Sequence, residues 1–237
     1  CNLNINKWRS IEEQNGIPLI VEMVLSGFLF WFIIITNLAS GRFGYETFSD
    51  LDSEAKLQKI YSDPKKFRIS VVLILIEHVS IISLAVMLFA AFSPYNMILA
   101  VVWTISRIGE GLIQIYNKKN YWGLLNIARQ YSGASGAEKN ALIDLGRSIL
   151  KTKNSSFRSA QILFSIGTLS YSILFVTYGV VPEIIGWFGI VAGILYGLGN
   201  GITLVKPKFK VLWIFGGLLS LLFEIVLGGW LLFSQLI

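Results

Sequence analysis

The sequence predicts an all-α fold: a polytopic membrane protein built as a bundle of about six transmembrane helices, in a single transmembrane domain over residues 1–237. Two observations lead to this prediction. Hydrophobic residues make up 54% of the chain and charged residues only 14%, with a mean hydropathy of +0.64, whereas soluble domains carry about 25% charged residues. The hydrophobic residues are also gathered into six segments that approach the roughly 20 apolar residues needed to cross a membrane.

The first three predicted spans lie in the first half of the chain. The first covers about residues 17–39, and Pro18 lies in its first turn, where proline is well tolerated. The second covers about residues 69–92 and is followed by Pro94, which favours a stop. A turn of only a few residues separates it from the third span, at about 97–116. These segments are therefore predicted as separate helices.

Three further spans follow at about residues 157–178, 184–205 and 211–236. The turn at residues 179–182 contains a glycine and a proline, and the turn before the last span contains three lysines. Residues of these kinds are typical of the connections between helices. The second half of the chain is therefore predicted to be almost entirely membrane-spanning.

Two longer polar segments, residues 42–68 and 117–156, interrupt the series of spans. Within the second, the apolar residues of the stretch 141–150 fall on one helix face. This pattern predicts a cytoplasmic amphipathic helix between the third and fourth spans, which lies along the membrane surface or caps the bundle. The residues 133–136, Gly-Ala-Ser-Gly, predict a break just before it.

Lysine and arginine are distributed unevenly between the two sides of this six-span arrangement. Seventeen of the 20 lie on one side, in residues 42–68, 117–158 and 206–210, and only Lys7 and Arg9 lie on the other. Because loops rich in these residues stay in the cytoplasm, we expect a multi-pass protein of the cell membrane with both termini outside the cytoplasm. Nucleic acid is not an expected partner, since the aromatic residues fall inside the apolar segments rather than among the basic residues.

Ionisable and amide side chains occur inside several predicted spans, although a charged group in hydrocarbon costs at least about 2.5 kcal/mol. In the third span such residues recur every three or four positions and so share one helix face. We therefore expect them to meet in the interior of the bundle, in a polar cluster. The candidate residues are Glu22, Glu77, His78, Arg107, Glu110, Gln114, Gln161 and Glu224.

The charges of this predicted cluster do not balance, because four carboxyl groups face one guanidinium, Arg107, and one imidazole, His78. Three hypotheses follow. The cluster is a buried ion-pair network in which Arg107 bridges Glu110 with Glu224 or Glu77 and fixes the helices. Alternatively, it lines a cavity that binds or passes a small polar or cationic ligand, protons included. The third possibility is an intramembrane metal-dependent enzyme, although one histidine outside an H-E-x-x-H pattern is a weak metal signal.

Motifs typical of enzymes are absent from the sequence, which has no G-x-S-x-G elbow and no phosphate-binding glycine loop. No catalytic residue, metal ligand set or cofactor is assigned, and the sequence favours a binding, transport or structural role over an enzyme. The one cysteine, Cys1, cannot form an internal disulfide. Its terminal position fits a processed or trimmed start, or a lipid-modified N-terminus.

The fifth predicted span carries glycine at four-residue steps, namely Gly189, Gly193, Gly197 and Gly201. Such a ridge lets a neighbouring helix backbone approach closely. Two kinds of neighbour fit: the first or sixth span of the same chain, or a second copy in a homo-oligomer. The expected partners are therefore the lipid bilayer, a small-molecule ligand or lipid, and another copy or another membrane protein.

Several segments form a recognisable series along the chain. They are Lys65-Lys66-Phe67-Arg68, Arg107-Ile108-Gly109-Glu110, and residues 157–164, 186–196 and 223–232. In order and spacing they resemble the prokaryotic membrane protein family Domain of Unknown Function 4386, over nearly the whole chain. One departure is Glu183, where similar proteins place a basic residue after the proline. The resemblance implies a compact six-helix bundle and implies no activity.

Overall fold

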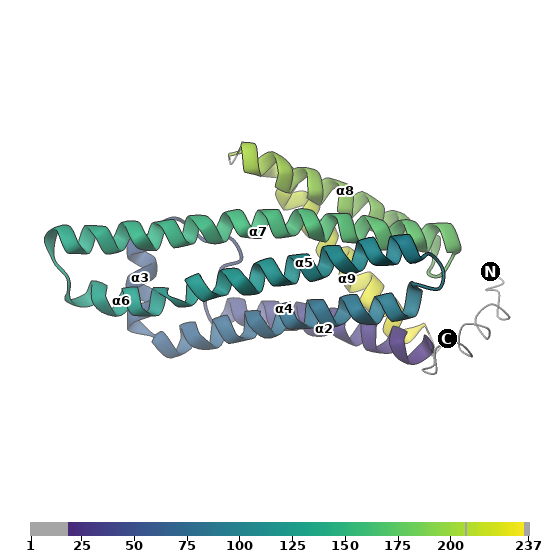
Figure 1. Ribbon diagram of the computed structural model, residues 1–237, viewed down its shortest axis with the longest axis horizontal. Helices are drawn as coiled ribbons and strands as arrows, with labels where there is room; N and C mark the ends of the chain where they lie inside the picture. The colour runs from purple at the N-terminus through teal and green to yellow at the C-terminus, as the bar shows by residue number, and fades with distance from the viewer. Residues whose placement is uncertain (1–18, 207, 235–237) are drawn as a thin grey trace.

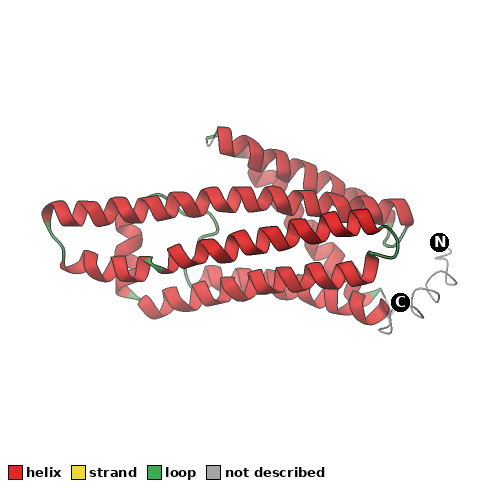
Figure 2. Cartoon of the chain, viewed as in Figure 1, coloured by secondary structure: helices red, strands yellow, loops and turns green. Residues whose placement is uncertain are grey.

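The computed structural model describes residues 19–206 and 208–234, and all regular structure within these residues is helical (Figure 1, Figure 2). Six of the helices in these ranges are long and apolar enough to cross a membrane, which confirms the predicted fold class. They are α2 (Leu19–Arg42), α4 (Pro64–Phe92), α5 (Met97–Trp122), α7 (Gly136–Tyr178), α8 (Glu183–Val205) and α9 (Val211–Phe233). Cys1, Lys7, Arg9 and the outer ends of the first and last predicted spans lie outside the described residues.

Local sequence explains where several helices begin and end. The backbone N–H of Lys66 donates to the Asp63 carboxylate at 2.9 Å, and Pro64 is in the first turn of α4. This cap starts α4 five residues before the predicted span. At α5, Asn96 accepts from the Leu99 N–H at 3.1 Å. Gly179, with φ of 62°, ends α7 in the left-handed conformation that glycine adopts without strain.

The predicted amphipathic helix over residues 141–150 is not a separate element. It is the first part of α7, a continuous helix of 43 residues that also contains the fourth span. No glycine or proline interrupts residues 147–166, so nothing in the sequence stops the helix between its polar and apolar halves. The chain does break before it, since α6 (Leu124–Gly133) ends at Gly133 and α7 begins at Gly136 with φ of 56°.

The apolar face of this first part of α7 packs against α3 (Ser53–Ser62) and α6, except for Leu145, which is 50% exposed. Leu57 and Leu150 are fully buried there, in a hydrophobic cluster of their own. A methyl group added at Gly146 would lie 3.3 Å from the Ser53 side chain, so the helices are in close contact. In Figure 1, α3 and α6 lie at the end of the molecule opposite to the start of α2 and the end of α9.

The six long helices form a closed helix ring, in which each packs mainly against two others. The order around the ring is α2, α4, α5, α7, α8, α9 and back to α2. Glycines allow the closest crossings. A methyl group at Gly27 of α2 would lie 2.8 Å from the backbone oxygen of Gly228 in α9, and one at Gly199 of α8 would lie 2.6 Å from the α9 backbone at Trp213. Small residues thus hold α9 against both of its neighbours.

The glycine ridge of α8 faces the fourth span, α7, rather than the first. A methyl group at Gly189, Gly193 or Gly197 would approach α7 side chains, at 2.2 Å from Ser172 Oγ in the closest case. Only Gly189 of these three also meets the sixth span, through Phe223, and Gly201 has open space around it. Sequence periodicity identifies a packing face but not the helix that packs against it. Here only four residues connect α7 and α8, so those two helices are neighbours.

Candidate functional site

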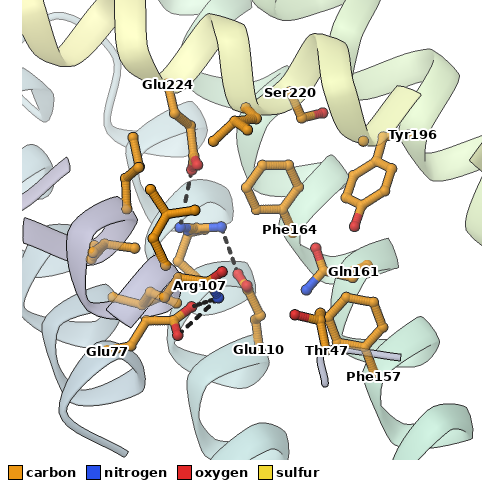
Figure 3. Close-up of a pocket in the computed structure, with 17 residues that line it drawn as sticks. Thr47, Glu77, Arg107, Glu110, Phe157, Gln161, Phe164, Tyr196, Ser220 and Glu224 are labelled. Carbon is orange, nitrogen blue, oxygen red and sulfur yellow. Dashed lines mark hydrogen bonds and ion pairs between the residues drawn. The ribbon is translucent and has the colours of Figure 1, made fainter. Parts of the chain in front are cut away.

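A cavity of about 380 Å³ lies inside the helix ring, and all six long helices contribute to its wall. Apolar side chains such as Ile33, Ile81 and Phe164 form part of this wall. Figure 3 shows the polar side chains converging on the cavity from opposite helices. The polar lining residues are Asn37, Thr47, Glu77, Arg107, Glu110, Gln161, Tyr196, Ser220 and Glu224.

Arg107 is the only positively charged residue of the wall and is 1% exposed. Its Nη1 donates to Glu110 Oε2 at 2.6 Å, and its Nη2 lies 3.7 Å from Glu224 Oε1 (Figure 3). The guanidinium carbon is also 4.6 Å from the centre of the Phe164 ring and 5.2 Å from that of Trp103, so both aromatic faces stabilise the charge. Arg107 therefore connects α5 with α9 and α7.

Glycine at position 167 makes room for this arginine. A methyl group there would lie 3.2 Å from Arg107 Cγ and 3.2 Å from Trp103 Cε3. The aliphatic part of Arg107 thus packs directly on the α7 backbone. Gly167 was not among the residues predicted from the sequence, although an isolated glycine in an otherwise bulky span indicates a close packing contact.

Glu77 has a different environment from the other two carboxyl groups of the cavity. Both of its oxygens accept from Asn37 Nδ2 of α2, at 3.1 Å each, and it forms no ion pair with any described residue. Glu77 is 7% exposed. Asn37 was not among the predicted residues, but its amide side chain within the first predicted span is the signal that identifies it.

Three predicted members of the cluster do not line the cavity. Glu22 lies fifteen residues before Asn37, about 22 Å along the helix, and its buried Oε2 has no hydrogen-bond partner among the described residues. His78 follows Glu77 directly and points about 100° away around α4; its Nδ1 contacts the backbone oxygen of Ile74 in the same helix. Gln114, one turn beyond Glu110, accepts from Lys118 Nζ at 3.3 Å. The structure thus brings together Glu77, Arg107, Glu110, Gln161 and Glu224.

The charges that line the cavity are unequal, because three carboxyl groups accompany one guanidinium. Arg107 approaches Glu110 and Glu224, which leaves Glu77 with a neutral amide as its hydrogen-bond partner. Such a wall attracts a positively charged or hydrogen-bond-donating group. Within the described residues, no three His, Cys, Asp or Glu side chains are grouped closely enough to hold a metal ion. The geometry therefore gives the metal hypothesis no support.

The connection between α2 and α3 covers one end of the cavity through Thr47, which is exposed on its other side. Lys153 of α7 fixes this connection: its Nζ donates to the backbone oxygens of Glu46 at 2.6 Å and Thr47 at 3.0 Å, and to Ser49 Oγ at 3.0 Å. Asn154 exchanges two hydrogen bonds with the Ser49 backbone, at 2.8 and 2.9 Å. The covering segment is thus held at several points.

Two ionisable groups beside this segment have shifted pKa values. Burial raises the pKa of the Tyr45 hydroxyl well above its ordinary value, and the nearby Tyr121 adds to the effect. Burial lowers the pKa of the Lys56 ammonium, although the Glu46 carboxylate 3.0 Å away favours its charged form. In the sequence, Lys153 is one basic residue among many and was not predicted to have this role. Its spacing of three and four residues from Leu150 and Phe157 places it on the buried face of α7, which is the signal for its role.

Comparison with known proteins identifies the family. The family model Domain of unknown function (DUF4386) matches residues 25–234, which is most of the chain. No curated protein and no solved structure shows significant similarity. The match covers five of the six long helices in full, α2 from residue 25 onward, and every residue of the cavity wall. The chain is therefore a multi-pass membrane protein that belongs to the DUF4386 family, whose function is unknown.

Proposed function

We propose that this protein binds or passes a small polar or cationic ligand, protons included, in the cavity inside the helix ring. One observation carries the proposal: Glu77, a buried carboxyl group in the cavity wall, has the neutral amide of Asn37 as its hydrogen-bond partner. A carboxylate that is removed from water is costly, and the buried Lys118 of α5 acts on Glu77 through its charge but forms no ion pair with it. A bound cation, or a proton, would offset that cost.

The shape of the cavity supports access from outside the bundle. Its wall extends from the buried Glu77 and Glu110 to Leu38, Leu221 and Thr47, which are exposed, the two leucines by 64% and 39%. Thr47 lies at the end of the molecule that carries the lysine-rich and arginine-rich segments. By the distribution of those charges, we infer that this end faces the cytoplasm of the cell and that both termini lie outside it.

Thermal stability of the purified full chain in detergent tests the proposal. Ammonium, methylammonium, guanidinium and tetramethylammonium chloride are each compared with sodium chloride at the same ionic strength. A cation that binds only the folded protein at a concentration of 100 Kd adds about 2.7 kcal/mol to the free energy of unfolding, which raises the melting temperature by roughly 5–10 °C. We expect at least one organic cation to produce such a rise.

Two matched variants locate the site. Glu77→Gln keeps an oxygen that can accept from Asn37 but removes the charge, so the stabilisation by the cation should disappear. Glu22→Gln neutralises another buried carboxyl group of the bundle, outside the cavity wall, and should keep it. The proposal fails if no cation stabilises the parent protein, or if Glu77→Gln responds as the parent does.

A structural or accessory role is the second candidate, because Arg107 joins α5 to α9 through Glu110 and Glu224. A protein that uses the cluster only to organise its helices would lose stability in Glu224→Gln and would show no response to any of the four cations. If the protein binds a cation mainly through Glu77, the Glu224→Gln variant should still be stabilised by that cation.

A further inference from the structure

A second cavity, of about 690 Å³, lies outside the helix ring, between the segment 48–51, α7 and the connection from α8 to α9. Three basic residues line it, Lys151 and Arg158 of α7 and Lys210 at the start of α9. The wall contains one carboxylate, Asp50. The proposed function does not use this cavity.

The three cations are not neutralised by ion pairs with described residues. Two of them are instead gathered around one aromatic ring, since the Arg158 guanidinium carbon is 4.7 Å and Lys210 Nζ 5.5 Å from the centre of the Phe48 ring. Phe48 thus lies close to two positive charges, at a cavity that has room for an anion. Such an arrangement attracts a group that carries a compact negative charge.

The cavity also adjoins exposed apolar residues at the boundary of the spans. Leu204 is in its wall, and next to it Val205 is 81%, Phe209 52% and Val211 73% exposed. Here α8 ends and α9 begins, and the apolar half of α7 starts close to Arg158. Basic residues beside exposed apolar ones, at the end of membrane-spanning helices, match the boundary between lipid headgroups and acyl chains.

We propose that this cavity binds the phosphate headgroup of an anionic membrane lipid through Lys151, Arg158 and Lys210. The acyl chains would lie against the exposed apolar residues at the ends of α8 and α9. A lipid rather than a free phosphate is the occupant, because only a lipid also gains from contact with that apolar surface.

Native mass spectrometry of the purified full chain tests this site. Phosphatidylglycerol and phosphatidylcholine with the same acyl chains are titrated in detergent, and inorganic phosphate is added as a competitor. We expect one phosphatidylglycerol to bind at least about tenfold more tightly than phosphatidylcholine, since each basic residue near the headgroup contributes to binding of an anion. Millimolar inorganic phosphate should leave most of this lipid bound.

A triple variant, Lys151→Gln with Arg158→Gln and Lys210→Gln, should lose this preference. The matched control, Lys65→Gln with Arg68→Gln and Lys119→Gln, removes the same charge from exposed positions that line neither cavity. It should keep the preference within about twofold of the parent. If the triple variant does not fold, Arg158→Gln alone should weaken binding of phosphatidylglycerol by about threefold or more.

Three outcomes would overturn the site. Equal losses in the triple variant and its control would show that overall charge, not this cavity, attracts the lipid. Equal binding of phosphatidylcholine and phosphatidylglycerol would remove the role of headgroup charge. Full displacement of the lipid by inorganic phosphate would identify a free anion as the occupant. None of these results depends on Glu77, so the proposed function is tested separately.

Discussion

Arg107 and Glu110 lie one turn apart on α5, and the guanidinium of the first donates to the carboxylate of the second across 2.6 Å. Both side chains are buried, at 1% and 3% exposed. Glu224 of α9 approaches the same guanidinium at 3.7 Å. Removal of the arginine would therefore leave two carboxyl groups in the interior without their cation.

From this geometry we expect Arg107→Ala to lower the free energy of unfolding by about 3–5 kcal/mol, as for other broken buried ion pairs. Arg107→Ala combined with Glu110→Ala should cost less, because one stranded carboxyl group is removed as well. Unfolding in detergent micelles, followed by tryptophan fluorescence, measures both values. Equal losses in the single and the double variant would show that the two residues do not interact.

Access of water to the cavity can be tested with two buried serines. Ser220 lines the cavity, whereas Ser172 packs against Gly189 of α8, and neither hydroxyl oxygen has a hydrogen-bond partner among the described residues. In a background with Cys1→Ser, we expect Ser220→Cys to react with a small water-soluble thiol reagent and Ser172→Cys to resist it. Equal protection of both cysteines would mean that the cavity is closed to water.

Lys153 should hold the segment that covers the cavity. Lys153→Met keeps most of the side-chain volume but removes the donors to Glu46, Thr47 and Ser49. We expect a loss of roughly 2 kcal/mol or more in the free energy of unfolding, since hydrogen bonds from charged groups are lost. Hydrogen exchange of residues 44–50 should also become faster. The exposed Lys65, which lines neither cavity, provides the control, and Lys65→Met should leave exchange in this segment unchanged.

Two glycines of the α8 ridge should respond in opposite ways to the same change. A methyl group at Gly189 would lie 2.2 Å from Ser172 Oγ and 2.6 Å from the Phe223 ring, whereas one at Gly201 would meet nothing within 4 Å. Gly189→Ala should therefore destabilise the protein by about 1–3 kcal/mol through overpacking. Gly201→Ala should be neutral, or stabilising by up to about 1 kcal/mol, because alanine favours the helix. Melting temperatures of the two variants give the comparison.

Contacts between residues close in sequence could be predicted, and contacts between distant residues could not. Arg107 and Glu110 are three residues apart on one helix, so helical geometry alone places them together. The contact of Asn37 with Glu77 joins residues 40 apart, and that of Lys153 with Glu46 joins residues 107 apart. No local sequence pattern predicts such pairs, because they depend on which helix faces pack against each other in the folded protein.

The sequence by itself determined the number of spans and the existence of a polar interior. In lipid, each of these apolar segments satisfies its backbone hydrogen bonds within itself as a helix, which sets the number of spans. Polar side chains avoid hydrocarbon, which places them in the interior. Only the tertiary structure decided which polar groups meet. The order of the helix ring and the rotation of each helix turn Glu77 and Glu224 into the cavity and leave Glu22, His78 and Gln114 out of its wall. The order and rotation of the helices depend on close packing of side chains against glycines. This packing is specific to each pair of helices, so the sequence of one helix alone does not predict it.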